Sequence, residues 1–349
     1  SELGTRIALA ESLATAMANL GEQLPPDDAL HQKFIKHLLN YEGTESFIAG
    51  GGIWPEPYKY DPTIERRSFF WGRDSTGQLR YYDDYNNPEG PGYHQEEWYV
   101  PAKYLKEGQA FWSKSYMDPY SYQPMVTVTV PMYRNNQFYG VATVDLKLEG
   151  LNNFLENISQ SFNGYAFAVD RNGKFLSFPD ERLTKRFGVD EHGARTEEFI
   201  DITELADIQA RFQPLASSVQ DIIERVVSNS IEAGTFNNTL AETIAQESYQ
   251  IGVSEAQLIS AVLAVLQNPD MLPNVQIKQL FLEDDLVLGE SAFAAIFKMP
   301  HTYWNIVTVM PYSKAIETSN FIYRNLVSAI VIAMLVSLIF MLVLVRRIL

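Results

Sequence analysis

The sequence contains no cysteine among its 349 residues. This absence excludes disulfide bonds, thiolate metal sites and cysteine nucleophiles together, and it is compatible with an oxidising compartment outside the cytoplasm. Histidine is also scarce, with five residues, and none of them stands in an HExxH motif or another spacing typical of paired metal ligands. We therefore expect no metal and no cofactor, and an enzyme is the least favoured class of function.

Basic residues are few as well. The chain has 27 Lys and Arg against 43 Asp and Glu, which gives a formal net charge of −16. Nucleic-acid phosphates are bound by clustered basic side chains, and this sequence has no such cluster outside its C-terminus. We therefore exclude nucleic acid as a partner, whereas an acidic chain suits a cationic one.

One stretch lacks charge altogether. From Leu326 to Val345 only two serines interrupt the apolar residues, and about 20 such residues span the hydrocarbon core of a bilayer. Arg346-Arg347 follow at once and predict the cytoplasmic end. We therefore predict a transmembrane helix over residues 323–346, with residues 1–320 outside the cytoplasm. Since the chain begins with Ser1 and ends just past this helix, we expect a fragment of a longer protein.

The N-terminal 40 residues have helical periodicity. Apolar residues recur at three- and four-residue spacing from Leu3 to Leu20 and predict an amphipathic helix. After the turn at Pro25-Pro26, Asp27 can cap a second helix that reaches Leu39.

Residues 41–150 have the texture of an antiparallel sheet. The clearest strands are Met125–Met132 and Phe138–Leu146, which flank a four-residue turn. Gly50-Gly51-Gly52 is predicted as the loosest joint of this sheet. No Lys-Ser or Lys-Thr pair follows these glycines, so we do not expect a nucleotide-binding loop.

The strand pattern restarts in the second half. Tyr165–Val169 precedes an Asn-Gly turn, and Ala292–Met299 and Trp304–Val309 close the sheet. These strands predict a second sheet subdomain over residues 151–320.

An acidic, helical insertion interrupts this second subdomain at residues 181–285. Capping-box patterns at Thr239–Glu242 and Ser254–Gln257 predict the starts of two of its helices. The sequence does not decide whether the insertion packs on the sheet or contacts a partner.

The stretch from His94 to Leu151 alternates aromatic rings with carboxylates in three motifs, HQEEWYVPA, SYMDPY and GVATVDLKLEGL. Strand alternation places Thr143 and Asp145 on one face and Val144 on the other. A carboxylate that is buried without a partner is costly, so Asp145 needs one. We interpret the three motifs as a single binding site.

These motifs resemble the double Cache (tandem PAS-like) ligand-binding domain of bacterial transmembrane receptors. In the amino-acid-sensing branch of that family, an arginine two positions before a Trp-Tyr pair holds the ligand carboxylate. The Tyr and Asp of a Pro-Tyr-x-Asp turn and an Asp in a Gly-Val-x-x-x-Asp strand hold the ligand amine. Five positions match these patterns: Trp98, Tyr99, Tyr116, Asp118 and Asp145. Ser115 stands in the place of the proline.

The resemblance implies an α+β fold: a long N-terminal helix and two PAS-like antiparallel-sheet subdomains. Residues 41–150 would be the membrane-distal, ligand-binding subdomain and residues 151–320 the membrane-proximal one. It also implies a homodimer through the N-terminal helix and a sensor that signals across the membrane. The output could be a chemoreceptor, a sensor kinase or a cyclic-dinucleotide enzyme.

Glu96 stands where the amino-acid sensors carry arginine. A ligand carboxylate would be repelled there, whereas a cation would meet Glu96 and the aspartates among aromatic faces, which favour cations. We therefore predict a small cationic amine as the ligand, with Trp54 and Trp71 as candidate further rings. This pattern resembles the amine-sensing branch of the family.

Three alternatives stay open. The chain could sense an amino acid or another small metabolite, or it could be a scaffold or adhesion module whose aromatic residues are simply core. Asp83-Asp84 and Glu96-Glu97 could form the carboxylate pair of a glycoside hydrolase, although Asp83-Asp84 fit better as solvated turn residues beside Asn86-Asn87-Pro88.

Overall fold

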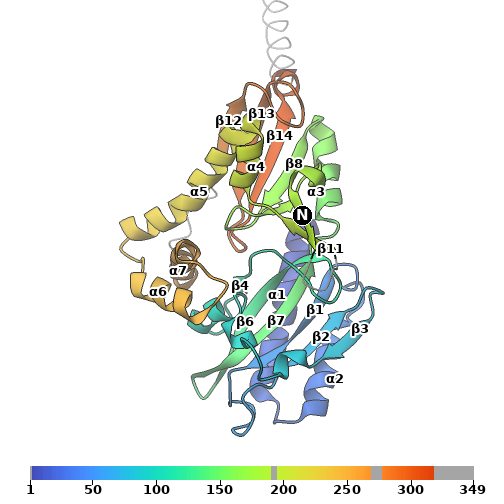
Figure 1. Cartoon of the computed structure of the whole chain (residues 1–349), viewed down its shortest axis with the longest axis vertical. Coiled ribbons are helices and arrows are strands. Elements are labelled where there is room, and N and C mark those ends of the chain that lie inside the picture. The colour runs from blue at the N-terminus through green and yellow to red at the C-terminus, as the bar shows by residue number, and fades with distance from the viewer. Residues whose placement is uncertain (1, 190–194, 269–276, 318–349) are drawn as a thin grey trace, which may run out of the picture.

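The computed structural model describes residues 2–189, 195–268 and 277–317 (Figure 1). The predicted transmembrane helix over residues 323–346, with Arg346-Arg347, lies outside these residues. Within the described ranges, no helix is both long and apolar enough to cross a membrane.

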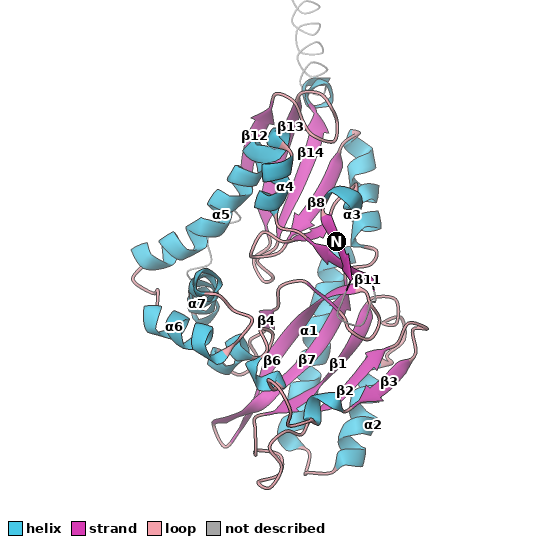
Figure 2. Ribbon diagram, in the orientation of Figure 1, coloured by secondary structure: helices cyan, strands magenta, loops and turns pink. Residues whose placement is uncertain are grey.

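Two antiparallel sheets, one in each half of the chain, form the frame of the molecule (Figure 2). The first has the strand order β3-β2-β1-β7-β6-β4, with β5 paired to β6. Its strands are β1 (Ile48–Pro55), β2 (Phe69–Arg73), β3 (Leu79–Tyr82), β4 (Phe111–Trp112), β5 (Tyr116–Met117), β6 (Pro124–Arg134) and β7 (Gln137–Lys147).

The N-terminal helices cover one face of this sheet. They are α1 (Glu2–Gln23) and α2 (Asp28–Leu39), and the Asp27 side chain caps α2 by accepting from the Leu30 N–H, as predicted. The apolar stripe of α1, which includes Ala10 and Met17, is buried against Val128 and neighbouring strand residues. This helical layer leaves the opposite face of the sheet for the binding motifs.

The β6–β7 hairpin forms as predicted, and Arg134 pairs with Gln137 at its tip. Asn135 and Asn136 have φ of 53° and 59°, the left-handed conformation that a tight hairpin turn requires and that asparagine tolerates.

The prediction for Gly50-Gly51-Gly52 is wrong, because all three glycines lie inside β1, a buried central strand. A Cβ atom at Gly51 would lie 2.4 Å from the Thr143 carbonyl oxygen, and one at Gly52 would lie 2.4 Å from that of Phe69. The glycines therefore permit a close approach of three strands rather than a flexible joint.

The second sheet has the order β12-β13-β14-β8-β9. Its strands are β8 (Tyr165–Val169), β9 (Phe175–Ser177), β12 (Ile277–Leu282), β13 (Ala292–Lys298) and β14 (Asn305–Pro311). Helix α3 (Leu151–Ser159) connects the two halves and packs on β8 and β9. The predicted strands are confirmed here, except that β12 was assigned to the insertion.

The insertion is less purely helical than predicted. It contains a hairpin, β10 (Lys185–Val189) and β11 (Arg195–Phe199), before the helices α4 (Ile202–Ile208), α5 (Gln213–Glu232), α6 (Asn238–Glu247) and α7 (Val253–Gln267). The predicted capping residues are wrong by two positions, since α6 begins after Asn237 and α7 after Gly252.

The helices of the insertion serve different cores. Helices α4 and α5 pack with the second sheet, α6 packs on the first half of the chain, and α7 has buried residues in both cores. Figure 1 shows α6 and α7 reaching down beside β4 and β6. The insertion therefore bridges both sheets.

Candidate functional site

Asp145 lies in a row of residues that crosses the first sheet. Thr127 on β6 stands opposite it, and its hydroxyl donates a 2.8 Å hydrogen bond to the Asp145 carboxylate. Tyr116 Oη lies 2.6 Å from the same hydroxyl. On the other side the row continues with Gly50 and Gly72, from which no side chain rises. Burial raises the pKa of Asp145 to about 7.

Aromatic rings surround the next part of this face. The Trp54 ring centroid lies 4.8 Å from that of Trp98, 5.1 Å from that of Tyr85 and 5.3 Å from that of Phe70. Trp54 Nε1 donates a 2.8 Å hydrogen bond to the Thr143 hydroxyl. Trp54 therefore has a satisfied polar group and a fixed orientation.

Asp118 begins a tight turn beside these rings. It accepts hydrogen bonds from the backbone N–H and hydroxyl of Ser121, and burial raises its pKa. Within that turn, Tyr120 stacks on Tyr82 at 3.9 Å, and its phenol donates to Asp84 at 2.7 Å.

Tyr85 marks the point where the carboxylates converge. Burial is the main cause that raises the pKa of its phenol, and four nearby carboxylates raise it further: Glu96, Asp145, Asp84 and Asp118. We call these four carboxylates, with Tyr85 and the rings of Trp54, Trp98, Tyr116 and Tyr120, the acidic aromatic site.

Glu96 has a partner from the insertion. Tyr249, in the turn between α6 and α7, donates a 2.7 Å hydrogen bond to Glu96 Oε1. Burial nevertheless raises the pKa of Glu96. Within the described part of the chain, no Lys, Arg or His is among the groups that shift the pKa of Glu96, Asp118 or Asp145. The site therefore gathers carboxylates that no basic side chain among the described residues pairs with.

Most of the predicted site residues come together, but two are differently placed. Tyr99 is fully buried beneath the site, and its phenol donates to Glu56 at 2.6 Å. Trp71 lies on the helix-covered face of the sheet, where Lys36 Nζ is 4.8 Å from its ring centroid. The structure does not bring Trp71 to the site.

Sequence reasoning assigned no binding role to Tyr85, Tyr120, Asp84 and Tyr249. Tyr120 is the last residue of the SYMDPY motif, Asp84 was considered only as a catalytic or turn residue, and Tyr85 follows Asp84 in the chain. Tyr249 is 153 residues from Glu96 in the chain, and no local pattern marks it.

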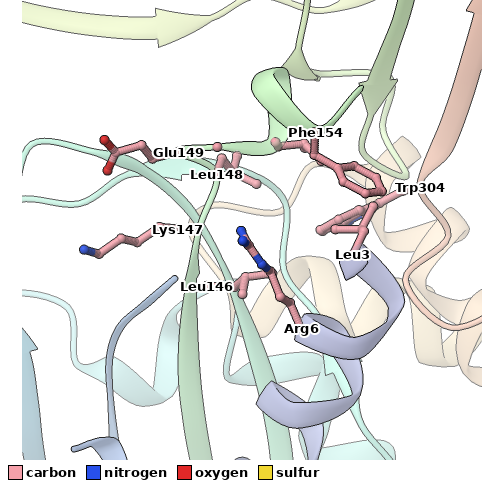
Figure 3. Close-up of a pocket in the computed structure, with 10 residues that line it drawn as sticks. Leu3, Arg6, Leu146, Lys147, Leu148, Glu149, Phe154 and Trp304 are labelled. Atoms are coloured by element: carbon pink, nitrogen blue, oxygen red, sulfur yellow. The ribbon is translucent and has the colours of Figure 1, made fainter. Parts of the chain in front are cut away.

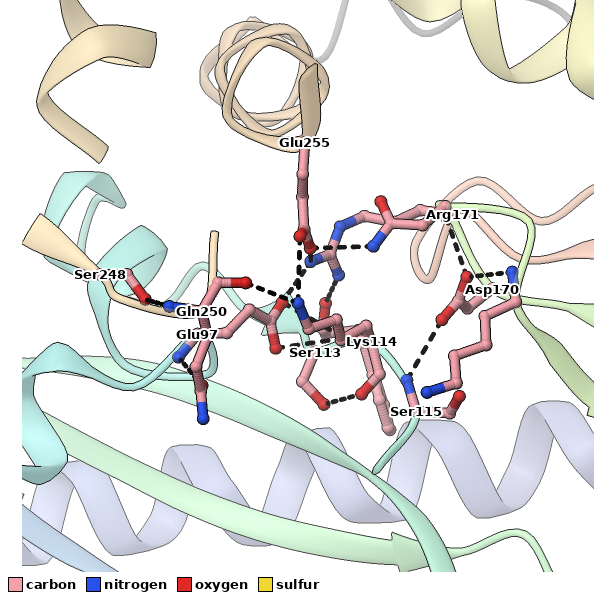
Figure 4. Close-up of polar contacts among 12 residues, drawn as sticks. Glu97, Ser113, Lys114, Ser115, Asp170, Arg171, Ser248, Gln250 and Glu255 are labelled. Carbon is pink, nitrogen blue, oxygen red and sulfur yellow. Dashed lines mark hydrogen bonds and ion pairs between the residues drawn. The ribbon is translucent and has the colours of Figure 1, made fainter. Parts of the chain in front are cut away.

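A second buried polar cluster lies beside the acidic aromatic site (Figure 4). Arg171, at the tip of the β8–β9 hairpin, forms an ion pair with Glu97 and a 3.2 Å ion pair with Glu255 of α7. It also donates to the Trp112 carbonyl at 2.6 Å and stacks over the Phe111 ring. Arg171 thus joins the first sheet, the second sheet and the insertion.

Lys114 and Asp170 complete this cluster. We call it the Arg171 network, and its members are Arg171, Lys114, Glu97, Glu255 and Asp170. Lys114 Nζ lies 3.0 Å from Glu255. Asp170 accepts from the Ser115 backbone N–H at 3.2 Å, directly before Tyr116. In this network each ionised group has an opposite charge or a backbone N–H as its partner.

A small cavity of about 20 Å³ occurs elsewhere, between the start of α1, the end of β7 and α3 (Figure 3). Its lining includes Leu3, Phe154 and Trp304. The volume is roughly that of one water molecule, and none of its lining residues belongs to the acidic aromatic site.

Comparisons with known proteins agree with this architecture. The structure resembles "Methyl-accepting Chemotaxis protein X", with a TM-score of 0.55 at 15% identity over 89% of this chain and 93% of that one. It also resembles the extracellular domain of a protein described as the histidine kinase mmHK1S-Z3, with a TM-score of 0.53 at 14% identity over 91% of each chain. The fold is therefore that of Cache-type sensor regions of chemoreceptors and histidine kinases.

A family model matches within the first half of the chain. Residues 34–153 match the family model of the first PDC sensor domain of methyl-accepting chemotaxis protein-like receptors. The matched family is one of sensor domains and not one of enzyme domains.

Two curated chemoreceptors match within short segments. PscA of Pseudomonas syringae pv. tomato is 34% identical over 59 residues, and PctB of Pseudomonas aeruginosa is 31% identical over 84 residues. These segments cover 17% and 24% of this chain, but only 9% and 13% of those receptors.

Proposed function

We propose that this chain is the extracytoplasmic ligand-binding region of a bacterial signal-transduction receptor, and that it binds a small cationic amine at the acidic aromatic site. The observation that carries the proposal is that Glu96, Asp118 and Asp145 accept hydrogen bonds from neutral groups around one aromatic cluster. Among the described residues, no basic side chain is a partner of these three carboxylates. An organic cation supplies the missing charge.

The rings add to this preference for a cation. Trp54 packs with Trp98 and Tyr85, and the Tyr116 hydroxyl lies 2.6 Å from that of Thr127, which bonds Asp145. A partly desolvated cation gains about 1–2 kcal/mol from a well-placed ring. Each hydrogen bond from an ammonium to a carboxylate adds about 1.5–3 kcal/mol. A ligand carboxylate would instead meet Glu96, where like-charge repulsion opposes binding.

A thermal-shift screen tests the proposal with a matched pair of variants. Amines should raise the Tm of the wild type, by mass action, and should raise that of Asp145→Asn far less. Asp207→Asn is the control, because Asp207 is exposed on α4. If amines left the wild-type Tm unchanged, the proposed ligand class would be wrong.

The receptor topology follows from the sequence and is part of the proposal. Residues 41–150 form the ligand-binding subdomain, residues 323–346 cross the membrane, and Arg346-Arg347 enter the cytoplasm. Two copies associate through the N-terminal helix. A reporter that functions only in the cytoplasm should be active when fused after Leu349, and activity of a periplasmic reporter there would contradict this topology.

A further inference from the structure

The turn between α6 and α7, residues 248–252, comes from the insertion but contacts the acidic aromatic site. Tyr249 Oη donates to Glu96 Oε1 at 2.7 Å. Gln250 Oε1 accepts from the Glu97 backbone N–H at 2.9 Å, and Gln250 Nε2 donates to Tyr249 Oη at 3.1 Å. These bonds form a continuous chain from the backbone of Glu97 to the side chain of Glu96.

Apolar packing fixes the position of this turn. The buried residues of the helix pair that share one cluster with Trp54, Trp98 and Tyr99 are Ala241, Ile244, Ile251, Ala256, Ile259 and Leu263. Lys114 Nζ donates to the Gln250 carbonyl at 2.9 Å, and Gln250 lies beside Glu97 (Figure 4). The turn is therefore built into the side of the site rather than lying loosely over it.

We propose that the α6–α7 turn is part of the ligand site, and that Tyr249 is a positioning and specificity-determining residue whose hydrogen bond orients and stabilises the Glu96 carboxylate for a cation. This inference rests on the proposed function as far as the ligand is concerned. It gives the insertion a role that local sequence patterns do not reveal.

The chemistry follows from the direction of the hydrogen bond. Tyr249 donates to one carboxylate oxygen of Glu96, which leaves the other oxygen for an ammonium group. Burial raises the pKa of Glu96, whereas the bonds from Tyr249 and Gln250 lower it by stabilising the ionised form. The titratable groups that face Glu96 are Tyr249 and Tyr85, since Glu97 turns toward Arg171.

Tyr249→Phe removes only the phenol, and Tyr249 is 58% exposed, so folding should not depend on it. We expect the variant to bind amines roughly three- to tenfold more weakly near neutral pH, because Tyr249 acts on the ligand only through Glu96 and less than the full contribution of a hydrogen bond to a charged group is lost. The midpoint of the pH dependence of binding should also move to higher pH. Tyr41→Phe, at an exposed tyrosine outside the site, should change neither quantity.

Calorimetry with tyramine, spermidine and trimethylamine over a pH series measures both effects. If Tyr249→Phe matched the wild type in affinity and midpoint while Asp145→Asn lost affinity, the role of Tyr249 would be refuted and the proposed function would stand. If none of the three amines bound the wild type, the proposed function and the ligand role of Tyr249 would both be overturned.

A measurement on the ligand-free protein decides the protonation part separately. Carbon-13 NMR titration of the Glu96 side-chain carboxyl, assigned with Glu96→Gln, should show a higher pKa in Tyr249→Phe than in the wild type. An unchanged Glu96 pKa would refute the claim that Tyr249 stabilises the Glu96 carboxylate, whatever the ligand.

Discussion

Glu96 and Glu97 are neighbours in the sequence but belong to two different acidic clusters. Glu97 enters the Arg171 network, where Arg171 and Lys114 lie among the carboxylates. Glu96 enters the acidic aromatic site, where described residues supply hydroxyl groups and rings but no cation. The carboxylates of the Arg171 network are therefore paired with cations of the protein itself, as in a structural contact. Those of the acidic aromatic site would need a cation from a ligand, as in a binding site.

The largest expected effect is on stability, when the guanidinium at the centre of the Arg171 network is removed. Arg171→Met would leave Glu97 buried without its ion-pair partner and would remove one of the two cations beside Glu255, so we expect a loss of about 3–5 kcal/mol in the free energy of unfolding. Denaturant unfolding measures this loss. Arg182→Met is the control, because Arg182 is 85% exposed and its removal should leave stability nearly unchanged; equal losses in the two variants would contradict the role of Arg171.

Removing a carboxylate from the acidic aromatic site should have the opposite effect on the ligand-free protein. The folded pKa of Asp145, about 7, lies above the ordinary aspartate value, so its contribution to stability is fully present at low pH and is lost as the pH rises through 7. At pH 8, Asp145→Asn avoids this loss and should be more stable than the wild type by roughly 2–4 kcal/mol. Denaturant unfolding at pH 5 and pH 8 measures the difference in stability between Asp145→Asn and the wild type. If Asp145→Asn were less stable than the wild type at pH 8, a cation would already neutralise Asp145.

Ligand affinity should depend on pH for the same reason. A cation binds the ionised form of Asp145, so affinity should fall as the pH drops through about 7, by up to roughly tenfold per pH unit. Calorimetry between pH 5.5 and 8.5 measures this slope. The slope should be shallower in Asp145→Asn, and an equal slope in both proteins would assign the titration to another group.

The smallest expected effect is on ligand affinity, and it is measured by comparing substitutions at two tryptophans on opposite faces of the first sheet. Trp98→Leu should weaken amine binding by about 1–2 kcal/mol through the loss of a ring face. Trp71→Leu should leave affinity unchanged, because Trp71 packs beneath α2 on the other face. Equal losses of affinity would mean that general destabilisation, and not contact with the ligand, explains the effect of Trp98.

Patterns within single elements predicted the parts of the fold that depend on local physics. The alternation of β7 placed Asp145 and Thr143 on one face, and the two asparagines fixed the hairpin turn. Alternation could not assign a face to Trp71, because Phe69, Phe70 and Trp71 are consecutive aromatic residues that satisfy either face.

Contacts between distant segments could not be predicted in this way. A run of three glycines is typical of a loop. In β1 these glycines lie in a strand, because the neighbouring backbone at Thr143 and Phe69 approaches too closely for any larger side chain. The contact of Tyr249 with Glu96 depends on how α6 and α7 pack across the two halves of the chain. Such packing leaves no periodic signal in the sequence.

The most direct test of the central claim compares an amine with the amino acid from which it derives by loss of the carboxyl group. Calorimetric titration of the purified protein with tyramine and tyrosine at pH 8 varies only the ligand carboxylate. The uncompensated charge of the acidic aromatic site predicts tight binding of tyramine and weak binding of tyrosine, with the preference reduced in Glu96→Arg. A wild-type protein that preferred tyrosine would contradict the claim that this site selects a cation.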